Sequence, residues 1–133
     1  GNVPTVDKDM APKIFRALHQ AIKQGLILSC HDLSEGGLAV AAAEMAFAGG
    51  VGVEIELKER TAVALFSESN TRFLIEVLPA HSVKLESVFA DLPYIRVGIT
   101  NDTALATTKW NGLTIVGAPL KELKANWQTP LNM

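Results

Sequence analysis

Residues 26–40 read Leu26-Ile27-Leu28-Ser29-Cys30-His31-Asp32-Leu33-Ser34-Glu35-Gly36-Gly37-Leu38-Ala39-Val40. The first part, residues 26–30, is a short apolar run of the kind that forms buried strands. Gly36 and Gly37 favour a tight turn after it, over residues 31–37. The chain is then apolar nearly all round to about Ala48, which indicates a helix buried on several sides. This stretch predicts a buried strand, a polar turn and a buried helix, the unit from which α/β folds are built.

The elements around this stretch follow from periodicity and from residues that start or stop helices. A helix capped by Asp7 or Asp9 is expected to end near Gln24, with Gly25 as its stop. Its apolar stripe is predicted to consist of Met10, Ile14, Leu18 and Ile22. Further along, we expect strands over residues 51–57, 73–78 and 94–100, a helix over 82–89, a hairpin turning at Asn111-Gly112 and a last helix over 120–127.

This order of helices and strands predicts an α/β (α+β) fold, in which a mixed sheet is flanked by helices. The sequence shows no internal repeat, no low-complexity tract and no linker. We therefore expect residues 1–133 to form a single domain.

The composition excludes several classes of function. The chain has 133 residues, 48% of them hydrophobic, and a net charge of −2. A nucleic-acid or membrane-surface protein needs a basic face, and no apolar run reaches the roughly 18 residues of a membrane span. The one cysteine, Cys30, has no internal disulfide partner. It is expected to be a buried core thiol. A cytoplasmic protein is the simplest interpretation.

The polar turn over residues 31–37 has two interpretations. In the first, Ser34 caps the helix while Gly36 and Gly37 expose backbone N–H groups to a phosphate. Since Asp32 and Glu35 would repel bare phosphate, this site would need a bridging cation such as Mg²⁺. In the second, the acidic residues and Ser34 satisfy the turn, and the glycines allow tight packing.

A second polar segment, residues 67–72, lies between two apolar runs. Its hydroxyls, amide, carboxylate and guanidinium suit a phosphorylated, hydroxylated ligand. The alternative is a polar surface loop containing an ion pair between Glu68 and Arg72. The residues by themselves leave both interpretations open.

Together the two segments resemble a known family. Residues 31–40, followed by Glu44-Met45-Ala46, are similar to the C-terminal domain signature of the aminoimidazole ribonucleotide (AIR) synthetase superfamily, also called PurM-like. The form of this turn, with residues 65–73, resembles the formylglycinamidine ribonucleotide synthase branch. The resemblance covers most of the chain, from about Asp7 to Gly117.

The resemblance implies a fold and an activity. The fold is an α/β sandwich partly like the ferredoxin fold. The activity is that of a ligase of purine biosynthesis, which uses ATP and Mg²⁺ to activate the amide oxygen of formylglycinamide ribonucleotide. Ammonia from glutamine then displaces the phosphate, forming a C–N bond. The chain would be a fragment of the synthetase subunit, inactive alone. Its partners would be the N-terminal AIR-synthetase-like domain, a glutaminase subunit and a small third subunit.

The resemblance also assigns residues. Asp32 matches a Mg²⁺ ligand, while Glu68, Ser69 and Asn70 match residues that contact the phosphoribosyl substrate. Ser34, Gly36 and Gly37 are our remaining candidates for contacts to ATP, ADP or substrate. The resemblance implies a synthetase subunit with two copies of an N-terminal and C-terminal domain pair, and the residue roles above are those of the first copy. This chain resembles the C-terminal domain of the second copy, whose site in some family members holds a nucleotide that is not turned over. No catalytic residue is expected, because the family's catalytic histidines lie in the N-terminal domains.

Two other functions remain open from the sequence. One is a structural or dimerisation domain with no ligand of its own, since a helix apolar on all sides favours an interface. The other is a different enzyme of the AIR synthetase superfamily, against which the form of the two signatures argues.

Overall fold

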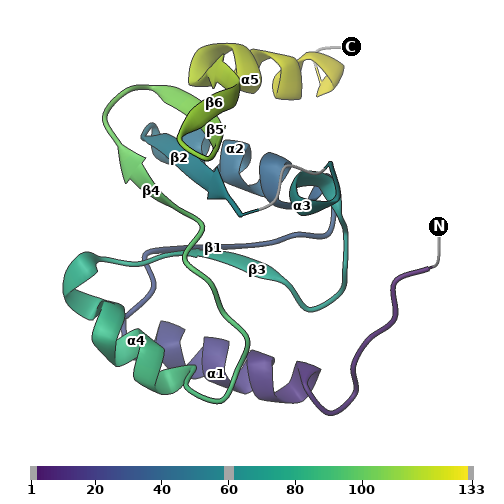
Figure 1. Cartoon of the computed structure of the whole chain (residues 1–133), viewed down its shortest axis with the longest axis vertical. Helices are drawn as coiled ribbons and strands as arrows, with labels where there is room; N and C mark the ends of the chain where they lie inside the picture. The colour runs from purple at the N-terminus through teal and green to yellow at the C-terminus, as the bar shows by residue number, and fades with distance from the viewer. Residues whose placement is uncertain (1–2, 59–61, 132–133) are drawn as a thin grey trace. The chain divides into compact units, whose positions relative to one another are not determined.

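A computed structural model describes residues 3–58 and 62–131 (Figure 1). In chain order the elements are α1 (Ala11–Lys23), β1 (Ser29–Asp32), α2 (Gly37–Gly49), β2 (Gly52–Leu57), α3 (Ala62–Phe66), β3 (Phe73–Glu76), the 3₁₀ turn η1 (Pro79–His81), α4 (Ser82–Val88), β4 (Gly98–Asn101), β5 (Leu105–Trp110), β6 (Leu113–Pro119), α5 (Leu120–Gln128) and the 3₁₀ turn η2 (Thr129–Leu131).

The chain folds into two compact units, each made of two separate stretches of sequence. The first unit consists of residues 3–34 and 68–95. The second consists of residues 35–58, 62–67 and 96–131. The backbone passes from one unit to the other within both polar segments, at Ser34–Glu35 and at Ser67–Glu68. The prediction of one domain over residues 1–133 stays a prediction.

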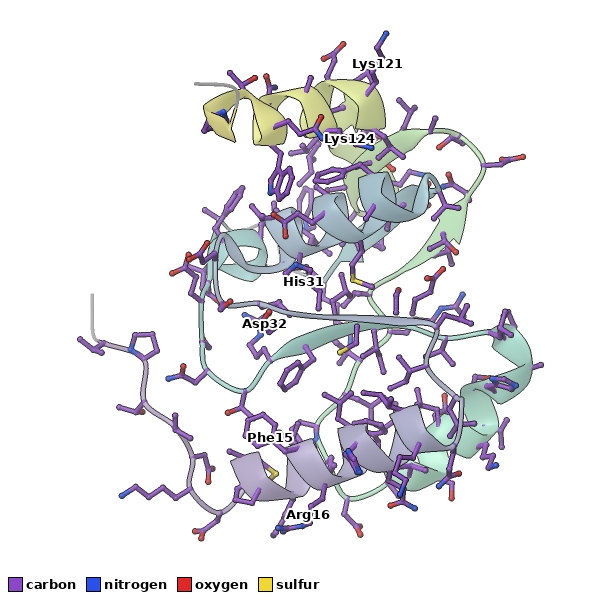
Figure 2. The ribbon with its side chains drawn as sticks, turned by 180° about the vertical axis from the view of Figure 1, so that it is seen from behind. Phe15, Arg16, His31, Asp32, Lys121 and Lys124 are labelled. Atoms are coloured by element: carbon purple, nitrogen blue, oxygen red, sulfur yellow. The ribbon has the colours of Figure 1, made fainter. Side chains whose placement is uncertain are left out.

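The first unit is an antiparallel pair of strands, β1 and β3, with α1 and α4 on one side (Figure 1). Its core is formed by Ala17, Leu18, Ala21, Leu26 and Phe89, with β3 residues packed against them. The ring of Phe15 on α1 also meets the ring of Phe73 on β3 edge to face, with centroids 5.8 Å apart (Figure 2). Helix and strand pair thereby bury each other's apolar faces.

The C-terminal end of α1 follows the prediction, but the predicted cap by Asp7 or Asp9 is wrong, because Met10 precedes the helix and no side chain caps it there. Asp7 Oδ1 accepts the backbone N–H groups of Asp9 and Met10, each at 2.9 Å, so Asp7 organises the turn before the helix. These two hydrogen bonds lower the pKa of the Asp7 carboxyl. At the other end Gly25 has φ +66° and Leu26 N–H donates to the carbonyl of Ala21, which confirms the predicted glycine stop.

The predicted apolar stripe of α1 is only partly correct. The buried residues of α1 are Ala11, Ala17, Leu18 and Ala21, whereas Ile22 is exposed. The core of the first unit contains Ala17, Leu18 and Ala21, so the packed face of α1 is made largely of small alanine side chains. Hydrophobicity alone placed the stripe on the larger residues.

The second unit contains a four-stranded mixed sheet in the order β4-β2-β5-β6. The central pair, β2 and β5, is parallel, and the outer pairs are antiparallel. The β5–β6 hairpin turns at Asn111 and Gly112, with φ of +49° and +74°. A two-residue hairpin turn of this type needs positive φ at both positions, which is why Asn-Gly predicts one. The predicted hairpin is therefore confirmed.

Helices α2 and α5 pack against each other and against one face of this sheet. Trp127 Nε1 on α5 donates to Glu44 Oε1 on α2 at 2.7 Å, and the Trp127 ring lies 5.8 Å from that of Phe47. Glu44, the polar exception on an apolar helix, thus accepts a hydrogen bond from the last helix. Lys121 and Lys124 of α5 are exposed (Figure 2).

A mixed sheet flanked by helices is therefore confirmed, with three differences in the elements. The first strand is Ser29–Asp32, later than the predicted residues 26–30. A five-residue helix, α3, occupies Ala62–Phe66, where a loop was expected. The strand expected over residues 94–100 is limited to β4, because only Gly98–Asn101 pairs with β2.

Candidate functional site

Within the first unit, the strand pair brings parts of the two polar segments together. Asp32, the last residue of β1, lies opposite Phe73, the first residue of β3. Just beyond the ladder, Leu33 N–H donates to the carbonyl of Arg72 at 3.1 Å. Because the strands are antiparallel, the start of the first segment meets the end of the second. Arg72 is thus hydrogen-bonded to the first segment. It follows the candidate residues Glu68, Ser69 and Asn70 by two to four positions.

Asp32, labelled near His31 in Figure 2, has an exposed side chain. Its side chain is 57% exposed, and its Oδ1 lies 3.5 Å from Nδ1 of His31. The same imidazole nitrogen lies 2.6 Å from the backbone carbonyl of Asp32, so Nδ1 carries a proton and donates to that oxygen. An exposed carboxylate keeps lone pairs available for a cation.

Cys30 lies on the same face of β1 as Asp32, since side chains two apart share a face. The prediction of a buried thiol is wrong, because Cys30 is exposed. The packing around its sulfur still removes enough water to raise the pKa of the thiol, and the negative charge of Asp32 raises it further. Strand β1 pairs with β3 in a two-stranded sheet, so it has a neighbouring strand on one side. Its side chains are therefore less buried than those of a strand in the middle of a sheet.

This arrangement predicts a change in thiol reactivity. The thiolate is the form that reacts with iodoacetamide. Asp32→Asn removes the nearby negative charge, so we expect the pKa of Cys30 to fall and alkylation at pH 8 to become faster than in the parent chain. Well above the pKa of the thiol both rates should converge. Asp91→Asn, an exposed acid outside β1, serves as the control, and equal rates for Asp32→Asn and the parent at pH 8 would contradict the assignment.

Within the second unit, the glycines of the turn pack against the other polar segment. Gly37 has φ +62°, and a Cβ added there would lie 2.7 Å from the carbonyl oxygen of Leu65 and 2.8 Å from that of Ser67. A Cβ on Gly36, with φ +72°, would collide with the side chain of Val40. Both glycines thus have a packing reason that involves protein atoms alone, which favours the tight-packing interpretation of this pair.

The predicted helix cap is wrong. The residue before α2 is Gly36, in the left-handed conformation, and no side chain caps the helix there. Ser34 lies two positions earlier and is exposed. Two successive glycines with positive φ turn the chain sharply, so Ser34 does not reach the position from which a side-chain oxygen bonds the first N–H groups.

Two features near the second segment have no signal in the sequence. Asn70 Nδ2 donates to the backbone carbonyl of Pro4 at 3.1 Å, although 66 positions separate them. Thr71 has φ +63°, a conformation that β-branched residues rarely adopt. Local sequence propensities predict neither a hydrogen bond to a distant backbone carbonyl nor a threonine with positive φ.

Metal binding at Asp32 stays a prediction that the donor set fits. In residues 3–58 and 62–131, no three His, Cys, Asp or Glu side chains gather into a group able to hold a metal ion. Mg²⁺ commonly keeps several waters and is held by one or two carboxylates together with phosphate oxygens, rather than by a full protein cage. A single exposed carboxylate suits that mode of binding.

A separate apolar cavity of about 320 Å³ lies inside the second unit, between α2, α5 and the sheet. Its lining includes Phe47, Phe66 and Trp127, and none of the candidate site residues. The polar site and the apolar cavity are therefore distinct features. Across the same described ranges, no helix has both the length and the apolar character needed to cross a lipid bilayer.

Comparison with known families identifies the chain. Residues 1–110 match the family described as AIR synthase related protein, C-terminal domain. The chain belongs to this family. The superfamily resemblance carried by residues 31–40 is thereby confirmed.

Relatives with assigned functions point to one branch of the superfamily. The chain is 38% identical, over 98% of its length, to phosphoribosylformylglycinamidine synthase subunit PurL of Thermosynechococcus vestitus. It is 36% identical, over 80% of its length, to the subunit of the same name in Thermoplasma volcanium. The chain spans 18% and 14% of these relatives.

Solved structures show the same fold. The Thermotoga maritima structure described as PurLQS superimposes with a TM-score of 0.82 at 16% identity, covering 92% of this chain and 23% of that one. Thermotoga maritima PurL complexed with FGAR gives 0.81 at 17% identity, covering 91% and 22%. At this identity the likeness concerns the fold alone, and it confirms the predicted fold class.

Proposed function

We propose that this chain is a C-terminal domain of the synthetase subunit of phosphoribosylformylglycinamidine synthase, an enzyme of purine biosynthesis. The observation that carries the proposal is the 38% identity over 98% of the chain to a PurL subunit. The whole enzyme would convert formylglycinamide ribonucleotide into the amidine, using ATP and the amide nitrogen of glutamine. This chain spans less than a fifth of its relatives, so it would contribute one part of that enzyme.

The proposed role of the chain is to bind and position ligands. The Asp32 carboxylate would hold Mg²⁺, and the ion would neutralise phosphate oxygens of ATP or ADP. Ser34, Gly36 and Gly37 would line the nucleotide or substrate site from the first polar segment, and Glu68, Ser69 and Asn70 from the second. Within the first unit, the contact of Leu33 with Arg72 supports the part of this site formed by Asp32, Ser34 and residues 68–70, because it ties the start of the first segment to the end of the second. The chain itself would supply no catalytic group.

The proposed partners are those of the whole enzyme. They are the N-terminal AIR-synthetase-like domain of the same subunit, a glutaminase subunit and a small third subunit, in the cytoplasm. The structure described as PurLQS, an assembly of the Thermotoga maritima relative, supports such an arrangement. The isolated chain is then expected to be inactive, and ATP-dependent amidine formation by this chain alone would contradict the proposal.

Calorimetric titration of ADP with Mg²⁺ into the chain tests the metal–nucleotide role. Asp32→Asn keeps the shape of the side chain and removes its charge, so we expect affinity to fall at least about tenfold, the range measured for lost charged contacts. EDTA should have an effect at least as large in the parent chain. The control is Asp91→Asn, which should bind as the parent does.

The titration has two outcomes that contradict the role. Equal affinity of the parent and Asp32→Asn would remove Asp32 from the site. Absence of binding by the parent would show that the chain alone carries no metal–nucleotide site.

A second candidate function is structural, with no ligand of its own. The packing of Gly37 against the carbonyls of Leu65 and Ser67 favours it, because the glycines are then required by the fold. If no nucleotide binds, this packing accounts for Gly37 in the turn. In that case the chain would serve as a wall or an interface for the rest of the subunit.

A further inference from the structure

The segment that leads into α1 is held by one of the candidate ligand residues. We call residues 3–10 the strap. Asn70 Nδ2 donates to the carbonyl of Pro4 in the strap at 3.1 Å, within the first unit. Apart from Met10, which is half-buried, the strap residues are exposed, so few apolar contacts order this segment. A single hydrogen bond therefore has a large influence on its position.

The other end of the strap is fixed to α1. Asp7 Oδ1 accepts the N–H groups of Asp9 and Met10, and the Asp7 carbonyl accepts the N–H of Ala11 at 2.9 Å. The strap is thus anchored at Asp7 by local bonds and at Pro4 by Asn70. Between the anchors lie Thr5 and Val6. Loss of the Asn70 anchor would allow both residues to move away from the second polar segment.

The neighbouring backbone shows why Asn70 is able to hold the strap. Thr71 has φ +63°, which is costly for a β-branched residue. Such strain persists when the surrounding structure fixes both sides. On one side the Arg72 carbonyl accepts the N–H of Leu33, and on the other Asn70 is bonded to Pro4. The Thr71 turn directs the Asn70 side chain, and the two flanking bonds hold the turn.

We propose that Asn70 is a positioning residue, whose amide tethers the strap to the second polar segment, and that the strap is a part of the candidate site. The proposal rests on the proposed function for its view of residues 68–70 as a site. It differs from the family resemblance in the role of Asn70, which here acts through the protein's own backbone.

Nuclear magnetic resonance on the chain without nucleotide tests the tether. In the parent, the backbone amides of Thr5 and Val6 should be ordered on the picosecond to nanosecond timescale. Asn70→Asp keeps the shape of the side chain and removes its N–H donors. We expect the order parameters of Thr5 and Val6 to fall below about 0.6, the range of flexible backbone. Asn70→Gln retains the donor on a longer arm and should restore part of the order.

A second measurement follows the cleavage of the strap by thermolysin before Val6, which is exposed and lies between the two anchors. Loss of one hydrogen bond should raise the population of the released strap, and hence the cleavage rate, about fivefold in Asn70→Asp. Ser69→Ala, at the adjacent exposed position, should cleave as the parent does. The urea midpoint should stay unchanged in every variant, which separates loss of a tether from general unfolding.

Parent-like order at Thr5 and Val6 in Asn70→Asp, or parent-like cleavage, would overturn the proposal. So would a shift of the urea midpoint large enough to account for the faster cleavage. Because these measurements use no nucleotide, they succeed or fail independently of the titration with ADP and Mg²⁺. The tether and the metal–nucleotide site are therefore distinguishable.

Discussion

Gly37→Ala is expected to destabilise the second unit by about 3 kcal/mol. Two effects combine at this position. The backbone has φ +62°, where an L-residue is strained, and a new Cβ would lie 2.7–2.9 Å from backbone atoms of Leu65, Phe66 and Ser67. Backbone atoms cannot swing aside as the end of a side chain does, so α2 or α3 has to move. Tryptophan fluorescence during urea unfolding measures the change, because both tryptophans belong to the second unit.

Gly25→Ala is the matched control for this substitution. Gly25 has a similar φ of +66°, and a Cβ added there meets nothing within 4 Å. The Gly25→Ala variant should lose about 1 kcal/mol of unfolding free energy, which is the cost of backbone strain alone. Circular dichroism of the whole chain during unfolding measures this loss. If Gly37→Ala costs no more than Gly25→Ala, the close approach to α3 has no energetic weight, and ligand access again becomes a reason for the glycine.

Leu26→Ala is expected to destabilise the first unit by about 3 kcal/mol. Leu26 is 2% exposed and belongs to the core of that unit with Ala17, Leu18, Ala21 and Phe89. Removing its branched end leaves a cavity among residues of α1 and α4, which relax only partly. Urea unfolding followed by far-ultraviolet circular dichroism provides the measurement.

Leu28→Ala, two residues later, is the control. The same side chain is deleted, but Leu28 is 55% exposed, so the expected loss is within about 0.5 kcal/mol. Equal losses at the two positions would contradict the burial pattern of this stretch. The pair also tests the prediction that residues 26–30 are all buried, which is wrong at Leu28.

The residues of the candidate site stay a prediction, and their geometry was foreseen only in part. The two polar segments were identified from composition and from the family resemblance, and the structure joins them at Leu33 and Arg72. The cap by Ser34 was wrong, and the bond from Asn70 to Pro4 was not foreseen. Both depend on where the backbone runs in three dimensions, which no local pattern encodes.

The sequence by itself determined the features that depend on a few neighbouring residues. Gly25 ends α1 with a positive φ, and Asn111-Gly112 turns the hairpin. Each follows from sterics within a single turn of chain, where glycine or asparagine is the residue that tolerates the required φ.

Only the tertiary structure decided which apolar residues are buried and why Gly37 has to be a glycine. Leu26 is buried and Leu28 exposed because β1 pairs with β3 and receives α1 on one face, partners that are distant in sequence. Gly37 is required because α3 ends against it. Burial and close approach depend on surfaces brought together by folding, so they are properties of pairs of segments and are absent from either segment alone.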